Sequence, residues 1–344
     1  MNGKSLVFTI FLLSFFLPSC FVFFSCASQA ASAEEYFSIG MAYYELGKFE
    51  EAEKWLNRAR SIDRTMVASE YNLGRIAFAT GRYEEAAKYF EGILERDPGN
   101  IMVLKAAAYT RIKNGNFEEA EALYAKVLAL VPEEADDGYN YALVLYAMEK
   151  YGQSEEILLK YPYALEENLD VLLLLAKTQK ALNKVEAVDN YAKWIDANTQ
   201  PVSQVLYEYA QVLEAAGFYA RALEQYQAAV TALQTDTETL KKSTLRFETA
   251  RLLFMADSGS GEGITELDAA VAEGFKDMEA LEKLLDDSRI SETHKNSIRR
   301  ALDTIRNPPV ETEVQSPEAE AEADSEADIE GSSDNAEEGK NPGI

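Results

Sequence analysis

Few residue types in this chain could carry out acid–base or covalent chemistry. The sequence has a single histidine, His294, and two cysteines, Cys20 and Cys26. An imidazole is the usual general acid or base in an enzyme, and a thiolate is a common nucleophile. We expect His294 to be a solvated surface residue because it stands in a polar segment, and both cysteines precede the predicted fold. No motif typical of a serine hydrolase, zinc protease or nucleotide-binding loop is present.

Paired carboxylates are the remaining candidates for acid–base catalysis. Two such pairs, Glu50–Glu51 and Glu84–Glu85, stand at equivalent places in a repeating pattern, each just after an aromatic residue. Glutamates in the first turn of a helix interact favourably with the positive end of the helix dipole. We therefore interpret these pairs as helix starts and predict a protein that is not an enzyme and has no cofactor or metal site.

The elements that carry these glutamates repeat along the chain. Gly47, Gly81 and Gly115 are each 34 residues apart, and Gly217 lies three further periods on. The segments around them are close variants of one another: ELGKFEEAEKWL at 45–56, ATGRYEEAAKYF at 79–90, KNGNFEEAEALY at 113–124 and AAGFYARALEQY at 215–226. A fixed period of this length indicates one supersecondary unit built many times over.

Within this period, four kinds of position recur without an insertion over six units. The first is always small: Gly40, Gly74, Ala108, Ala142, Ala176, Ala210. The second follows seven residues later, where a helix would end and the chain reverse: Gly47, Gly81, Gly115, Glu149, Asn183, Gly217. Glycine suits such a turn because it adopts a left-handed conformation without a Cβ clash. The third is mostly aromatic and the fourth mostly alanine: Phe49, Tyr83, Phe117, Tyr151, Val185, Tyr219, then Ala52, Ala86, Ala120, Ser154, Val188, Ala222.

This pattern resembles the tetratricopeptide repeat (TPR), which also has a proline near the end of each unit, as Pro98 and Pro132 supply here. The resemblance implies an all-α fold, a right-handed α-solenoid of stacked helix-turn-helix repeats. The fourth and fifth units depart from the pattern, since they lack the turn glycine. The six predicted repeats span residues 33–236: 33–66, 67–100, 101–134, 135–168, 169–202 and 203–236.

After residue 236 the register slips. The segments LRFETARLLFMA and ITELDAAVAEGF indicate a divergent seventh repeat over 237–275, with a longer turn, DSGSGEG, between its helices. Two more amphipathic helices are expected over 276–306, the last one opened by Ser291, and we interpret them as a C-terminal cap. The ends of repeat arrays are usually atypical because one face meets water.

The N-terminal segment has the pattern of an export signal. After Lys4 comes a long uncharged apolar stretch, followed by small residues that end at Ala33. We predict a signal peptide over 1–33 and a mature, periplasmic or envelope protein starting near Glu34. Two alternatives remain open: a retained membrane anchor, and a lipoprotein lipidated on Cys26 or Cys20. In every case the membrane would be contacted only through this leader.

The C-terminal segment 307–344 has twelve acidic residues, one lysine and no aromatic residue. Such a composition cannot bury enough apolar surface to order itself, so we predict a disordered acidic tail. The whole chain has a net charge of −26, which argues against a nucleic-acid partner. We expect no small-molecule substrate.

The resemblance implies that the first helix of each repeat lines a concave groove that binds an extended peptide or a partner helix. Asn72 and Asn140 would hold a peptide backbone, and the excess of basic residues over Asp136 and Asp170 would favour an acidic extended segment. The chain's own tail could compete for this groove, and it remains open that the tyrosines only pack between neighbouring helices. The residues at the family's groove positions are Tyr71, Asn72, Arg75, Lys105, Tyr109, Lys113, Tyr139, Asn140, Tyr146, Lys177 and Lys180.

Two functions fit these features. The favoured one is a non-enzymatic scaffold or adaptor of the cell envelope that binds a protein partner. The alternative is a structural subunit of an envelope complex, held together through its own repeats.

Overall fold

The computed structural model describes residues 31–256 and 261–308, and all secondary structure in these residues is helical. The all-α prediction is confirmed. Of the predicted leader (1–33), residues 1–30 with Cys20 and Cys26 lie outside the described residues, and so do residues 309–344 of the predicted acidic tail (307–344). The described chain divides into two compact units, one up to Leu245 and one from Arg246. No helix of the described chain is long and apolar enough to cross a bilayer.

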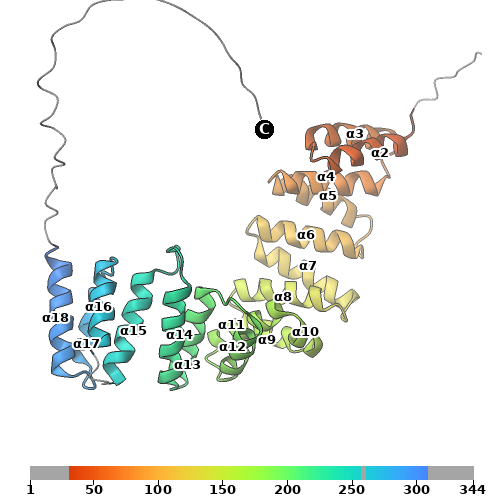
Figure 1. The fold of residues 1–344 in the computed structure, drawn as a ribbon. Helices are drawn as coiled ribbons and strands as arrows, with labels where there is room; N and C mark the ends of the chain where they lie inside the picture. Colours follow the sequence, from red (N-terminus) through yellow and green to blue (C-terminus); the bar gives the residue numbers. More distant parts are fainter. Residues whose placement is uncertain (1–30, 257–260, 309–344) are drawn as a thin grey trace, which may run out of the picture. The chain divides into compact units, whose positions relative to one another are not determined.

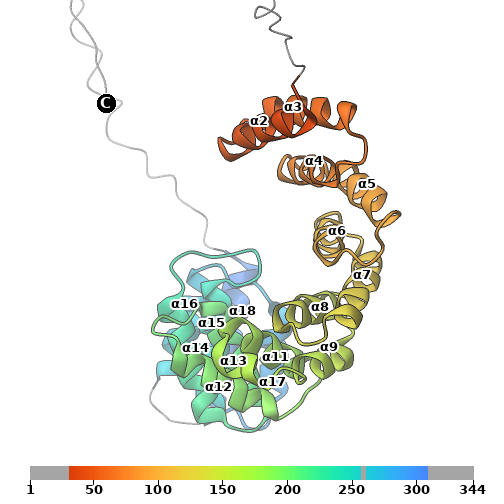
Figure 2. The ribbon, with the colours of Figure 1, turned by 90° about the vertical axis from the view of Figure 1, so that its right-hand side faces the viewer.

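The first unit is a succession of helical pairs, and neighbouring pairs lie side by side (Figures 1 and 2). Each pair corresponds to one 34-residue period of the sequence. The first helices of the pairs are α2 (Ala33–Glu45), α4 (Val67–Ala79), α6 (Ile101–Lys113), α8 (Ala135–Ala147), α11 (Leu169–Ala181) and α13 (Ser203–Ala215). The second helices are α3 (Phe49–Ile62), α5 (Tyr83–Leu94), α7 (Phe117–Leu130), α9 (Tyr151–Leu158), α12 (Glu186–Ala197) and α14 (Tyr219–Ala232).

All six predicted turn positions have a left-handed backbone. Four of them are glycines, but Glu149 and Asn183 adopt the same conformation, with φ of 58° and 54°. The hydrogen bonds of the turn are also the same: the Glu149 N–H donates to the Tyr146 carbonyl at 2.9 Å, and the next N–H donates to the Leu145 carbonyl at 2.8 Å. The turn therefore keeps its geometry where glycine is missing.

Small residues let the two helices of a pair approach closely. A Cβ atom added to Gly74 would lie 2.6 Å from the ring of Phe90, and one added to Gly40 would lie 2.8 Å from Leu56. Both partners are fully buried. The first position of the period is small because the large residue on the facing second helix fills its place.

The fourth pair differs from the others. Its second helix, α9, ends at Leu158, and a separate short helix, α10 (Pro162–Glu167), follows. Pro162 stands at the first position of α10, where its missing N–H costs nothing. The ring of Tyr161 packs against Gly138, and its hydroxyl donates to the Pro132 carbonyl at 2.9 Å. The regular helical pair expected over 135–168 is thus interrupted in its second half.

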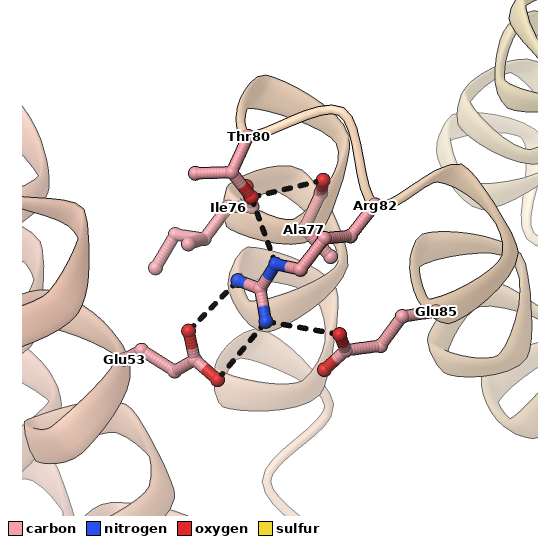
Figure 3. Close-up of polar contacts among 6 residues, drawn as sticks. All are labelled: Glu53, Ile76, Ala77, Thr80, Arg82 and Glu85. Atoms are coloured by element: carbon pink, nitrogen blue, oxygen red, sulfur yellow. Dashed lines mark hydrogen bonds and ion pairs between the residues drawn. The ribbon is translucent and has the colours of Figure 1, made fainter.

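A repeated ion pair connects neighbouring repeats, with its two residues 29 positions apart. Glu53 of α3 accepts from Arg82, which follows the turn glycine of the next pair, at 2.8 Å. Figure 3 shows that this guanidinium also contacts Glu85 and Thr80. The same positions are occupied by Glu121–Lys150 and Glu155–Lys184, each at 2.6 Å. Sequence reasoning missed this contact, although opposite charges at a constant spacing were visible.

The second unit contains most of the predicted seventh repeat together with the predicted cap. Its helices are α15 (Lys242–Ala256), which begins at the unit boundary, α16 (Glu262–Ala272), α17 (Met278–Asp286) and α18 (Glu292–Arg306). One hydrophobic core joins all four, from Phe247 to Leu302. The seventh repeat and the cap are therefore packed as one body.

His294 corrects one expectation from the sequence. Its side chain is buried, with 6% of its surface exposed, and its ring lies 4.6 Å from that of Phe254. Ser291 does begin α18, since its hydroxyl accepts from the His294 N–H at 3.3 Å. The contact with Phe254 of α15 places the histidine in the core instead of the solvent.

Candidate interaction surface

The predicted groove residues lie on the first helices α4, α6, α8 and α11, on what we call the first-helix face. Three large apolar residues of this face are exposed to solvent: Met102 by 54%, Tyr109 by 46% and Leu143 by 39%. They come from the neighbouring helices α6 and α8, which belong to the same unit. A contiguous apolar patch is typical of a surface that binds a partner, whereas single exposed apolar residues are common on any protein.

The two asparagines are placed differently. Asn72 is 7% exposed, and its amide is already used: Nδ2 donates to the Ala68 carbonyl at 2.8 Å and Oδ1 accepts from Arg75 at 3.0 Å. Asn140 is half-buried. In this conformation the Asn72 amide is not open to a peptide backbone, so its expected role would require those bonds to break.

Most tyrosines of the face also pack against rings of neighbouring helices. The ring centroids of Tyr71 and Phe90 are 5.7 Å apart, and those of Tyr146 and Tyr151 are 5.3 Å apart. Burial raises the pKa of the Tyr139 and Tyr146 phenols. These tyrosines contribute to packing, and Tyr109 combines a ring contact with a 46% exposed surface.

The charges of the face are more balanced than the sequence indicated. Lys105 lies 2.7 Å from the buried Asp137, and Lys177 lies 3.4 Å from Glu208. Neither Asp137 nor Glu208 was included in the excess of basic residues predicted from the sequence. Two of the five basic residues predicted for the groove therefore have acidic partners, and the basic excess of the groove stays a prediction.

Glu208 is also the centre of a polar cluster on α11, α12 and α13. It accepts from the hydroxyl of the buried Tyr191 at 3.1 Å and from Gln204 at 3.0 Å. Lys180 donates to Gln211 at 2.6 Å, and burial lowers the pKa of its ammonium group. These groups satisfy one another.

The two remaining cations of the face are Arg75 and Lys113, and both are associated with aromatic rings. The Arg75 guanidinium lies 4.6 Å from the ring centroid of Tyr44, and Lys113 lies 5.4 Å from that of Tyr109. Tyr109 in turn packs on Phe78, with the centroids 5.3 Å apart. The sequence did not single out Tyr44 and Phe78, because their contacts form only when neighbouring repeats stack.

Comparison with known proteins agrees with the helical pairs. Two tetratricopeptide repeat family models match residues 33–65 and 77–136. The chain is a tetratricopeptide-repeat protein. A crystal structure of a TPR protein from Parabacteroides merdae has the same fold, with a TM-score of 0.52 and 18% identity over 80% of this chain and 99% of that one.

Curated relatives align with more than half of the length of this TPR protein, among them the following two. An uncharacterized lipoprotein of Treponema pallidum (strain Nichols) is 28% identical over 186 residues, which are 54% of this chain and 93% of the lipoprotein. The TPR repeat-containing protein YpiA of Bacillus subtilis (strain 168) is 25% identical over 212 residues, 62% of this chain and 50% of YpiA. Neither similarity extends over the whole of this chain.

Proposed function

We propose that this TPR protein is a non-enzymatic scaffold that binds a segment of a partner protein on its first-helix face. The observation that carries the proposal is the set of exposed apolar residues on neighbouring first helices, Met102, Tyr109 and Leu143. Water contact of such side chains is unfavourable, and a partner that covers them gains roughly 25 cal/mol per Å² of apolar surface removed from water.

We further propose that the protein acts in the cell envelope. The support comes from the export-type leader in the sequence and from similarity to a protein described as a lipoprotein. A lipidated cysteine, Cys26 or Cys20, would hold the repeats at a membrane surface. Cleavage by the general signal peptidase would release them into the periplasm.

The test compares capture of proteins from envelope extracts by two variants with the wild-type protein. Leu143→Glu places a charge on the first-helix face, and the matched control Leu130→Glu places one on α7, where Leu130 is 50% exposed. We expect Leu143→Glu to lose the captured partner and Leu130→Glu to retain it. Equal capture by both variants would refute binding on the first-helix face.

The alternative function, a structural subunit that assembles through its own repeats, predicts a different oligomeric state. Light scattering after size-exclusion chromatography measures this state directly. A monomer supports the scaffold that binds a separate partner. A stable homo-oligomer that Leu143→Glu dissociates would support the structural subunit instead.

A further inference from the structure

A pocket opens on the first-helix face where the first three repeats meet. Tyr44 of α2, Arg75 and Phe78 of α4, and Ala106 and Tyr109 of α6 contribute to its walls. Its volume is about 150 Å³. All three helices belong to the first compact unit, and Tyr109 at the rim is exposed.

Arg75 is a cation without an acidic partner among the described residues. Its Nη1 donates to Asn72 at 3.0 Å and its plane lies over Tyr44, which leaves Nε and Nη2 as donors. An arginine without an acidic partner is unusual in a chain with 59 acidic and 33 basic residues. Arginine presents its donors in a planar fork that matches a carboxylate.

Most other cations of the first-helix face already have a partner within the fold. Lys105 and Lys177 are neutralised by Asp137 and Glu208, and Lys180 donates to Gln211. Lys113, on the ring of Tyr109, and Lys180, which is near the charge of Glu208, also form no ion pair with a carboxylate among the described residues. Attraction for an anion is therefore concentrated at the pocket and not spread along all the repeats.

The size of the pocket indicates what enters it. A cavity of about 150 Å³ in a protein core holds one benzene ring. The walls include Tyr44, Phe78, Phe90 and Tyr109, and aromatic rings pack favourably edge to face against such walls. We propose that the pocket binds a phenylalanine side chain of a partner segment, with a carboxylate beside it in that segment held by Arg75.

This inference rests on the proposed function and names the chemistry that the partner must have. The chain's own acidic tail could supply the carboxylate, but residues 309–344 contain no aromatic residue. The tail therefore cannot supply the ring. We assign the pocket to a partner and make binding of an acidic segment without a ring an outcome of the test.

The experiment measures binding of short fluorescent peptides to the full exported chain at low salt. One peptide has Glu-Phe-Glu at its centre; in the others either the phenylalanine is replaced by alanine or both glutamates are replaced by glutamine. We expect the loss of the ring to weaken binding about tenfold or more, since a buried aromatic side chain dominates such a contact. We expect the loss of the carboxylates to weaken it about fivefold.

Two variants of the protein separate the ring from the charge. Ala106→Leu fills the pocket without a change in charge, and should weaken the phenylalanine peptide but not the alanine peptide. Arg75→Gln should remove the preference for glutamate over glutamine. The matched control is Lys88→Gln, which removes one charge from the exposed surface of α5. Circular dichroism of each variant checks that the helices are intact.

The outcomes distinguish this inference from the proposed function. Equal binding of the phenylalanine and alanine peptides would show that the site recognises acidity alone, as the tail could provide, and would overturn the inference. So would equal affinities of Arg75→Gln and Lys88→Gln for the acidic peptide. If Arg75→Gln and Ala106→Leu still capture the envelope partner that Leu143→Glu loses, the scaffold stands and this pocket is not its site.

Discussion

Glu149 has a backbone conformation that a residue with a side chain adopts at a cost, and replacing it with glycine should stabilise the protein. Its φ is 58°, whereas the equivalent Gly81 and Gly115 have φ of 77° and 78°. The left-handed conformation costs a residue with a Cβ roughly 1–2 kcal/mol. Glycine avoids this cost but makes the unfolded chain more flexible, which lowers the free energy of unfolding by about 0.4–1 kcal/mol. The net gain expected for Glu149→Gly is therefore about 0.8 kcal/mol, the middle of a range from about 0 to 1.6 kcal/mol.

The assay is the midpoint of urea unfolding, together with hydrogen exchange of the amides in α8 and α9. In a repeat array each unit contacts mainly its neighbours, so the gain should appear as slower exchange in these helices first. The Glu149 side chain is exposed, so its removal should have little other effect. Glu149→Ala is the first control, and it should bring no comparable gain because its Cβ retains the strain.

The reverse substitution is the second control. A Cβ added to Gly115 would meet no atom within 4 Å, so Gly115→Ala should destabilise the protein through backbone strain alone, by about 1 kcal/mol. Loss of stability in Gly115→Ala without a gain in Glu149→Gly would refute the reasoning. It would show that the fourth repeat relaxes this strain in a way that the turn geometry does not reveal.

Three further predictions concern other parts of the chain. Gly74→Ala should destabilise the first unit by about 1–3 kcal/mol, measured by urea unfolding, because its Cβ would be forced against Phe90. The side-chain and backbone N–H groups of Arg289 lower the pKa of Asp287 to about 2. This contact therefore stabilises the fold above the ordinary pKa of 3.8 and is lost as the pH falls toward 2. In Arg289→Gln, an NMR titration should show a higher titration midpoint for the Asp287 carboxylate. Cleavage after Ala33, as the sequence predicts, would remove the Ser32 cap of α2, so a chain that starts at Glu34 should be less stable to urea than one that starts at Ser32, by about 1 kcal/mol.

The repeat architecture was predictable from the sequence because it depends on local geometry. A left-handed turn favours glycine or asparagine, and a close helix pair requires a small residue opposite a large one, as with Gly74 and Phe90. Both constraints act within one 34-residue unit. They recur at the same position in every unit, so even Glu149 and Asn183 could be assigned to turns by register alone.

The candidate site was predictable only in outline. The register placed Arg75 and Tyr109 on the first-helix face, but it could not show that Tyr44 and Phe78 would join them around one pocket. That pocket forms between three repeats, and its shape depends on how closely their helices stack.

The charges of the site and the burial of His294 were decided by the tertiary structure. The charge of Lys105 is neutralised only because stacking of the repeats brings the Asp137 carboxylate, 32 residues away in the sequence, to 2.7 Å from it. His294 lies in a polar segment, yet the packing of α18 on α15 places it against Phe254. The sequence determined which residues each helix presents. Which of them meet a partner within the fold, and which stay available to another molecule, depends on the distances between helices that only the folded chain sets.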